Sequence, residues 1–389
     1  MPGPYRIIFI RIFFIIRHCF IVSQHVDVLM SLTKNLKNNI MINRKLFMGL
    51  TLATPFCVSS FASTGSKIRV GQVGLKHPHA FGKLKALKQL SETYEIVGVV
   101  EPDTKLREKV KGVNWLTEKQ LLDEKQLDLV VVETDVKDIA KIGIKFAQKG
   151  CHLHLDKPAG TNLKDLQDLF KISNRKKLII QLGYVLRYNP VFQFMSRAVR
   201  GGWFGDILEI DASMGKRADQ SLRHNLGQYR GGGFFELAGN ILDPVISILG
   251  KPNTVLGVNK QTKLAMGDRL PDHQLGILEY DKAIVTLRCS HNDPFGFAKR
   301  RFSIFGTHGG MDIHPLESGS FTLYLEKDQE DFQKGVRKIQ LPHSNRSYAR
   351  DFQDLAQCIA GKSKFNWSPE HDLVVQKTLI EISESGINE

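Results

Sequence analysis

Residues 151–158 read Cys-His-Leu-His-Leu-Asp-Lys-Pro, and this stretch decides how the rest of the chain is interpreted. The first five residues form a short, largely apolar run, which is typical of a strand buried in a parallel sheet. Asp156, Lys157 and Pro158 then place charge and a fixed backbone angle where such a strand would end. Open parallel sheets bind their ligands at the carboxyl ends of strands. The stretch therefore predicts a binding cleft at Asp156–Pro158.

Strand-like and helix-like segments alternate on the N-terminal side of this stretch. Strand patterns cover Lys67–Gly74, Glu95–Val100 and Leu127–Val132, and helical patterns cover Ala80–Leu90 and Ile139–Lys149. Such alternation predicts βαβ units and an α/β domain built on a doubly wound parallel sheet of the Rossmann type.

A turn containing glycine follows the first strand. Gly71, Gly74 and Gly82 form a stretched version of the G-x-G-x-x-G pattern, in which the backbone approaches a pyrophosphate. Gly71 and Gly74 are therefore expected to contact a dinucleotide, together with His77 in the same turn. Glu101 closes the second strand, where a carboxylate can accept hydrogen bonds from ribose hydroxyls and repel a 2′-phosphate. The expected cofactor is NAD, with NADP as the alternative, unless Glu101 only belongs to a solvated turn.

A different pattern covers the second half of the chain. Segments with one apolar face alternate along Ile207–Asp211, His273–Tyr280, Ala283–Ser290 and Arg301–Phe305. Such strands are typical of an open antiparallel sheet that packs on one face only. We expect residues 67–187 to form the nucleotide-binding domain. Residues 188–389 are expected to form an α+β domain with a mostly antiparallel sheet and helices on one face.

Several motifs resemble the Gfo/Idh/MocA family, named after glucose–fructose oxidoreductase, inositol dehydrogenase and rhizopine catabolism. Asp156–Pro158 resembles the family's Glu-Lys-Pro, and Thr134 stands at its Thr-Pro, with Asp135 replacing the proline. Residues 183–190 (GYVLRYNP) resemble its Gly-x-x-x-Arg-Phe-x-Pro crossover. Residues 231–243 (GGGFFELAGNILD) resemble its helix motif Gly-Gly-Gly-x-x-x-Asp-x-Gly-x-His-x-x-Asp.

The resemblance implies a role for each matching residue. Lys157 would lie near the nicotinamide and the substrate hydroxyl, where a cation stabilises a developing alkoxide and can relay a proton. In the alternative, it is a surface lysine at a strand end. Thr134, Asp156, Pro158 and Arg187 are carried over as residues around the cofactor.

The helix motif departs from the family at its two polar positions. Glu236 replaces the family's aspartate, and Asn240 replaces its catalytic histidine. Positions four apart share one helix face, so both side chains can point into the cleft. Asparagine takes up no proton near neutral pH. Either Lys157 transfers the proton, or another group such as His224 in the loop before the glycines does so, or the cleft only binds.

The resemblance implies an NAD(P)-dependent oxidoreductase that acts by hydride transfer on a sugar, a cyclitol or a derivative. Two alternatives stay open. One is an enzyme that cleaves a glycosidic bond through a transient oxidation of the sugar. The other is a non-catalytic homologue that binds a carbohydrate or a nucleotide. The expected partners are a small sugar-like substrate and further copies of this chain, since the family uses its second-domain sheet for subunit contact.

Residues 1–66 are expected to be an over-extended start followed by a signal peptide near residues 41–62. Arg44 and Lys45 supply a basic start, Leu46–Ser59 an apolar run, and Ser60-Phe-Ala62 a cleavage site. Export to the periplasm follows, with no stable membrane span after processing. Asn43–Met48 resembles a twin-arginine signal with lysine in second place, and ordinary secretion is an equal alternative.

Composition argues against other classes of protein. The net charge of +14 falls to +8 without residues 1–66, and the remaining bases are interspersed with acids, so no nucleic-acid partner is expected. The five cysteines form no CxxC pair, which gives zinc and redox motifs no support. His77, His79, His152 and His154 could face one another around a metal, but we expect no metal site.

Overall fold

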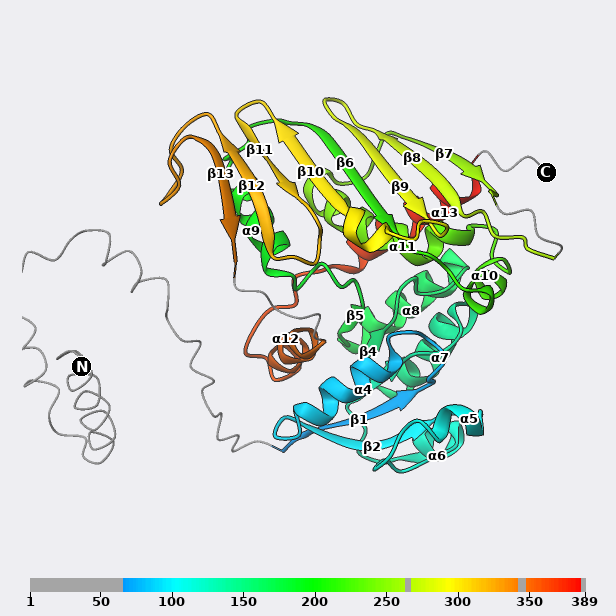
Figure 1. Ribbon diagram of the computed structural model, residues 1–389. Helices are drawn as coiled ribbons and strands as arrows, with labels where there is room; N and C mark the ends of the chain where they lie inside the picture. The colour runs from blue at the N-terminus through cyan, green and yellow to red at the C-terminus, as the bar shows by residue number, and fades with distance from the viewer. Residues whose placement is uncertain (1–65, 263–266, 342–347, 386–389) are drawn as a thin grey trace, which may run out of the picture. The chain divides into compact units, whose positions relative to one another are not determined.

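The computed structural model describes residues 66–262, 267–341 and 348–385, which form two sheets and the helices that cover them (Figure 1). The expected start and signal peptide lie outside these residues. The strands of the N-terminal sheet pair in parallel and are largely buried, as is typical of a sheet whose crossover helices cover both faces. Its strands follow the order β2-β1-β3-β4-β5. They are β1 (Ile68–Val73), β2 (Tyr94–Val100), β3 (Leu129–Val132), β4 (His152–Leu155) and β5 (Ile180–Leu182).

The order reverses direction at β1, since β2 lies on one side of it and β3 on the other. Ligands of doubly wound sheets bind at this switch point, outside the carboxyl ends of the strands. The connecting helices are α4 (Ala80–Gln89), α5 (Thr104–Arg107), α6 (Glu118–Asp123), α7 (Ile139–Lys149) and α8 (Leu163–Lys176). The predicted Rossmann-type arrangement is confirmed.

Local sequence explains where several helices begin and end. Thr117 and Gln120 form a reciprocal capping box at the start of α6, and Asn162 accepts a hydrogen bond from the backbone of α8. Gly150 ends α7 with a φ of 107°, a conformation that glycine adopts without a steric penalty.

The second sheet has the order β13-β12-β11-β10-β6-β9-β8-β7. Only the β6–β9 pair is parallel among the pairs described, so the sheet is mostly antiparallel, as predicted. Figure 1 shows its helices on one face. The strands are β6 (Ile207–Gly215), β7 (Thr254–Lys260), β8 (His273–Glu279), β9 (Ile284–Ser290), β10 (Arg301–Gly306), β11 (Gly309–Ile313), β12 (Ser320–Leu325) and β13 (Gly335–Gln340).

The remaining helices are α9 (Pro190–Arg200), α10 (Gln220–Leu226), α11 (Gly232–Leu249), α12 (Ala349–Ile359) and α13 (Pro369–Glu384). Within the described residues, α11 alone is long and apolar enough to cross a membrane by those two measures, but 78% of it is buried inside the protein. It packs on β6 and β9 and is the core helix of the second half.

Helix α12 returns from the second half to the first. It packs on α4, and the Tyr94 hydroxyl donates a hydrogen bond to the Phe352 carbonyl. Phe352 joins Val70 and Leu129 in one buried apolar cluster. The predicted boundary between residues 187 and 188 remains a prediction, but the core of the first half includes this late helix.

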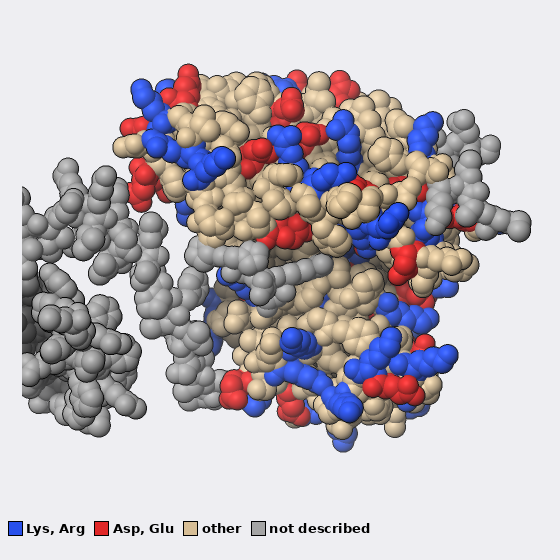
Figure 2. All heavy atoms as spheres, viewed as in Figure 1, with Lys and Arg blue, Asp and Glu red and all other residues tan. Residues whose placement is uncertain are grey.

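Figure 2 shows basic and acidic side chains interspersed on the visible face, in keeping with the mixed charge expected from the sequence.

Candidate active site

Gly74 forms the turn at the carboxyl end of β1. Its φ is 92°, and a Cβ atom there would lie 2.6 Å from the Glu133 carbonyl oxygen, so only glycine fits without strain. Gly71 lies inside β1, where a side chain would collide with Leu121 instead. Gly82 lies inside α4. Of the three glycines in the predicted series, Gly74 alone shapes the turn.

Counted from Gly74, the second and third glycine positions of G-x-G-x-x-G carry Lys76 and His79. The Lys76 side chain is half exposed and forms an ion pair with Asp135 at 3.0 Å across the turn. His79 turns inward from the start of α4. The side chains of Lys76 and His79 therefore contact Asp135 and Asp156 rather than the backbone of the turn.

Glu101 ends β2 and is buried. Its carboxylate accepts hydrogen bonds from the Leu75 amide at 2.7 Å and the Asp103 amide at 2.9 Å. A carboxylate has about four acceptor positions, so these two bonds leave capacity for ribose hydroxyls. The glycine turn at Gly74 and the acid at Glu101 together fit a dinucleotide, and its binding by Glu101 stays a prediction.

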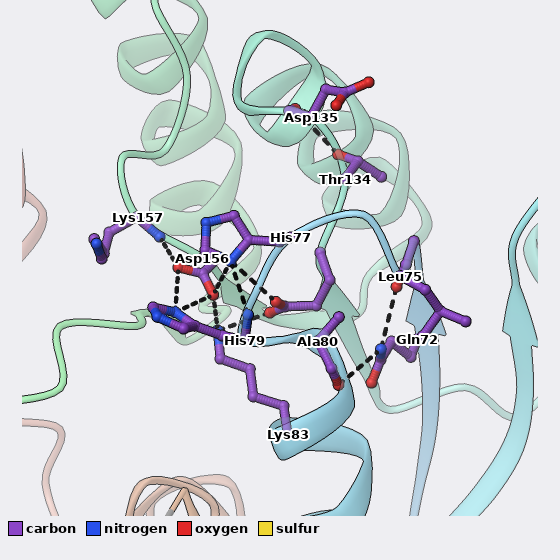
Figure 3. Close-up of polar contacts among 12 residues, drawn as sticks. Gln72, Leu75, His77, His79, Ala80, Lys83, Thr134, Asp135, Asp156 and Lys157 are labelled. Atoms are coloured by element: carbon purple, nitrogen blue, oxygen red, sulfur yellow. Dashed lines mark hydrogen bonds and ion pairs between the residues drawn. The ribbon is translucent and has the colours of Figure 1, made fainter. Parts of the chain in front are cut away.

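Asp156 is the centre of a buried polar cluster at the carboxyl end of β4 (Figure 3). The Lys83 ammonium lies 2.6 Å from its carboxylate and 2.7 Å from that of Glu133. The Nδ1 atoms of His77 and His79 each lie 3.0 Å from Asp156 Oδ2. The sequence placed Asp156 and His77 at the site but missed Lys83 and Glu133.

Burial and charge set the protonation of this cluster. Burial acts to raise the pKa of Asp156, but His77, Lys83 and His79 outweigh it and hold that pKa well below its usual range. Burial raises the pKa of Glu133 well above its usual range, against the opposing charge of Lys83. Burial also lowers the pKa of His79 to about 3, so its ring is neutral at neutral pH.

Lys157 connects this cluster to the second half of the protein. Its backbone amide donates to Asp156 at 2.6 Å, and its side-chain ammonium donates to the carbonyl oxygen of Glu236 on α11. The peptide bond between Lys157 and Pro158 is cis. Thr134, at the end of β3, lies beside Asp135, to whose carbonyl its hydroxyl donates at 3.4 Å. The structure therefore brings the Lys157 side chain into contact with the backbone of Glu236, whereas the catalytic role expected of Lys157 stays a prediction.

Glu236 is held by two side chains that follow strands of the second sheet. Its Oε1 lies 2.6 Å from the Lys216 ammonium, and its Oε2 lies 2.7 Å from Nε2 of His291. Burial acts to raise the pKa of Glu236, but the hydrogen bond from His291 and the charges of Lys216 and Lys157 hold it well below its usual range. Glu236 is therefore a carboxylate at neutral pH.

Asn240 lies one turn further along α11, on the same face. Its amide nitrogen donates to the Leu237 carbonyl at 3.3 Å, and its buried oxygen has no hydrogen-bond partner among the described residues. Asn240 lines the cavity but has no group that titrates near neutral pH.

A cavity of about 310 Å³ opens where these groups meet. Its size is at the low end for small-molecule sites. Its polar lining includes His79, Lys157, Lys216, Glu236, Asn240 and Arg300.

Two predicted site residues lie elsewhere. Arg187 is buried, does not line the cavity, and forms ion pairs with Asp243 at 2.7 Å and with Asp372. Its observed contacts bind the crossover segment to α11 and α13. His224 lies on α10 rather than in the predicted loop, is exposed, and does not line the cavity.

Among the described residues, two groups have metal-ligating side chains close together. One is His77, His79 and Asp156, where the Lys83 ammonium already supplies positive charge to the same carboxylate. The other is Asp243, His371 and Asp372, where the Arg187 guanidinium does so. His152 and His154 instead bond to the Ile179 amide and to Gln181. The expectation of no metal stays a prediction.

Comparison with known proteins agrees with this geometry. Residues 68–184 match a family model described as the Gfo/Idh/MocA oxidoreductase family with an NAD-binding Rossmann fold, and residues 192–312 match the Gfo/Idh/MocA C-terminal domain. Curated relatives include scyllo-inositol 2-dehydrogenase (NAD⁺) of Bacillus subtilis, 21% identical over 62% of this chain and 70% of its own. Myo-inositol 2-dehydrogenase of Thermotoga maritima is 22% identical over 62% and 74%.

Solved structures share the fold. An oxidoreductase of Thermotoga maritima superimposes with a TM-score of 0.69 at 22% identity, covering 82% of this chain and 97% of that one. A levoglucosan dehydrogenase in complex with NADH and levoglucosan gives 0.69 at 16% identity, with coverage of 82% and 97%. The two family models together match more than half of the chain. The chain belongs to the Gfo/Idh/MocA family of oxidoreductases and carries that family's NAD-binding Rossmann domain.

Proposed function

We propose that this protein is an NAD-dependent dehydrogenase or reductase that acts on a CH–OH carbon of a neutral sugar or cyclitol. The observation that carries the proposal is the position of Lys157. Its ammonium lies at the carboxyl end of β4, is fixed to the Glu236 carbonyl, and lines the cavity between the two sheets. Bound NAD would supply the hydride acceptor or donor.

The charges of the cavity favour a neutral polyol over an acid. Lys216 is paired with Glu236, and Arg300 is paired with Glu317 at 2.5 Å. Each pair presents hydrogen-bond donors beside acceptors, which suits neighbouring hydroxyl groups. The names of the relatives, two inositol dehydrogenases and a levoglucosan dehydrogenase, are in keeping with this class of substrate.

In this reaction Lys157 would hydrogen-bond the reacting oxygen and stabilise the charge that develops on it. The neutral His79 ring and the tyrosines at 188 and 348 would enclose the substrate and limit water. Glu101 would favour NAD over NADP by repelling a 2′-phosphate.

The test is a screen in which the purified protein and NAD are incubated with inositols, sugars and aryl glycosides. Formation of NADH is monitored by its absorbance near 340 nm. Stoichiometric NADH from an inositol or sugar supports the proposal. Cleavage of a glycoside without net reduction would replace it with the transient-oxidation alternative, and binding without turnover would replace it with the binding homologue. A Lys157→Ala variant is expected to lose at least about 100-fold in kcat.

We also propose that the protein associates with a second copy through the open face of the second sheet. Four exposed apolar side chains lie in one row across the strands: Ile284, Phe305, Tyr324 and Val336. The strand pairing connects them, since Ile284 and Phe305 both pair with Glu209, Phe305 and Tyr324 both pair with Gly310, and Tyr324 pairs with Val336. Exposed apolar rows of this kind mark interaction surfaces. Sedimentation of the purified protein tests the proposal.

Export is proposed on the sequence of residues 41–62 alone. Cell fractionation with mass spectrometry of the mature N-terminus tests it, because peptides from residues 1–40 in the mature protein would contradict the expected start and cleavage.

A further inference from the structure

The proposed reaction needs a group that exchanges a proton with the substrate hydroxyl, and Asn240 does not supply one. Its amide donates to its own helix and its oxygen is only an acceptor. The Lys157 ammonium donates to the Glu236 carbonyl and, in the proposed reaction, stabilises the charge on the reacting oxygen, so a second residue of the cavity wall would take the proton.

Most titratable groups of the wall are unsuited to that step. Glu236 has both oxygens engaged and a pKa held well below its usual range, so it stays ionised. His79 is a weak base, because burial lowers its pKa to about 3, and its ring already faces Asp156. The Tyr188 hydroxyl donates to Asp354 at 2.8 Å, and burial raises its pKa.

Lys216 has the required position. It follows β6 directly, lines the cavity, and keeps 16% of its side chain exposed. Its ammonium forms an ion pair with Glu236, which engages one of its three donor positions. A group that reaches both the cavity and solvent can exchange its proton with water between turnovers.

Its orientation is fixed by a chain of contacts. Gly215 pairs with Ser290 in the parallel β6–β9 ladder, which places Lys216 beside His291. The fully buried His291 ring contacts one oxygen of Glu236, and the other oxygen contacts the Lys216 ammonium. Arg300 donates to the Gly215 carbonyl at 3.2 Å and holds the end of the strand.

We propose that Lys216 is the catalytic proton-transfer residue of this enzyme and that His291 positions it through Glu236. The proposal rests on the proposed function. In oxidation, the substrate C–H bond breaks and its hydride passes to NAD⁺, while the hydroxyl proton passes to the Lys216 amine. The products are the carbonyl, NADH and the Lys216 ammonium, which then loses its proton to water. In reduction the same ammonium protonates the carbonyl oxygen as the hydride arrives.

The charged groups around Lys216 all come from other elements. Glu236 lies on α11, His291 follows β9, Lys157 follows β4, and Arg300 precedes β10. Oxidation needs the amine and should rise with pH, whereas reduction needs the ammonium and should fall.

The test uses the full-length mature enzyme with NAD and the best substrate from the screen. Lys216→Ala is expected to lower kcat by about 100-fold or more, the usual contribution of acid–base catalysis, with little change in NADH affinity. Primary amines added to this variant should restore turnover, with rates that follow the amine pKa. A merely structural lysine would show no such rescue. His291→Gln should give a smaller loss and move the alkaline limb of the pH profile.

Lys282→Ala is the matched control, because Lys282 forms an exposed ion pair with Asp206 on the same domain and should leave kcat unchanged. If the wild-type enzyme is active and the Lys216→Ala variant has the same kcat, the role of Lys216 is overturned while the proposed function stands. A variant that is inactive, binds NADH normally and gains nothing from amines would also overturn it. Wild type that turns over no sugar or cyclitol would overturn the proposed function and this inference with it.

Discussion

Lys83 offers a direct test of the buried cluster, because its removal should cost far more stability than a lysine on α4 normally contributes. The ammonium is fully buried and lies 2.6 Å from Asp156 and 2.7 Å from Glu133. Lys83→Met keeps most of the apolar side chain and removes the charge, leaving two carboxylates without their shared cation. Removing one partner of a buried ion pair costs about 3–5 kcal/mol. We expect the free energy of unfolding to fall by that amount at pH 7.

The loss should depend on pH in a defined direction. Asp156 has a lowered pKa in the folded protein, so it contributes stability above its unfolded pKa of about 3.9 and loses it as the pH falls through the folded value. Without Lys83 both carboxylates bind protons more readily. The deficit of Lys83→Met should therefore shrink as the pH falls from about 7 to about 5, where protonation replaces the lost cation.

Urea denaturation followed by circular dichroism measures these differences. Lys85→Met is the matched control, since Lys85 is exposed on the same helix, and should change stability by less than about 0.5 kcal/mol. Adding Glu133→Gln to Lys83→Met removes the second acidic group of the cluster and should restore part of the loss. A Lys83→Met loss below about 1 kcal/mol, which is the range of a surface pair, would refute this account of the cluster.

Gly74→Ala should abolish NADH binding measured by fluorescence titration, whereas Gly112→Ala, which shares a positive φ but meets no atom within 4 Å, should not. Glu101→Gln should raise the affinity for NADP relative to NAD by about tenfold, through loss of charge repulsion, and an unchanged ratio would contradict the assignment. Arg187→Met should lower stability by about 3–5 kcal/mol while leaving the NADH affinity of the folded fraction unchanged, because its contacts are two buried aspartates. Ile284→Lys should lower the sedimentation mass of the protein, and an unaltered mass would contradict association through that row.

Residues whose chemistry depends on strand ends were predictable from sequence. A buried parallel strand ends where its apolar run ends, so Asp156 and Lys157 had to reach the carboxyl edge of the sheet. Helical spacing likewise put Glu236 and Asn240 on one face of α11. Both inferences use periodicity along a single element.

Residues buried by distant contacts were not predictable in this way. Lys83, Lys85 and Lys88 look alike within one amphipathic helix, yet only Lys83 of these three is buried, because β4 delivers Asp156 to it and Tyr348 covers that side of α4. The sequence contains only a weak indication that Lys83 is buried, namely that it lies one turn into a helix that begins at a binding loop. His224 shows the converse, since a histidine near a motif is usually an ordinary surface residue.

The pairing of Lys216 with His291 depends on strand order, which periodicity does not reveal. The two residues are 75 positions apart in the sequence and become neighbours because β6 pairs in parallel with β9. A hairpin arrangement of the same strands would have separated them. The residue that transfers the proton is therefore hard to predict from sequence when the expected residue is replaced, as at Asn240, and the substitute comes from a different element.

The two lysine–carboxylate–histidine clusters differ mainly in exposure, and this difference separates their roles. Lys83 is fully buried between two carboxylates, where an ammonium has no path to substrate or solvent, so its charge can only hold Asp156 in place. Lys216 keeps contact with the cavity and can exchange a proton. Lys157 bonds to both clusters, through its amide to Asp156 and through its ammonium to the Glu236 carbonyl. A change at either cluster should therefore displace Lys157, so Lys83→Met should lower turnover even in the fraction that stays folded.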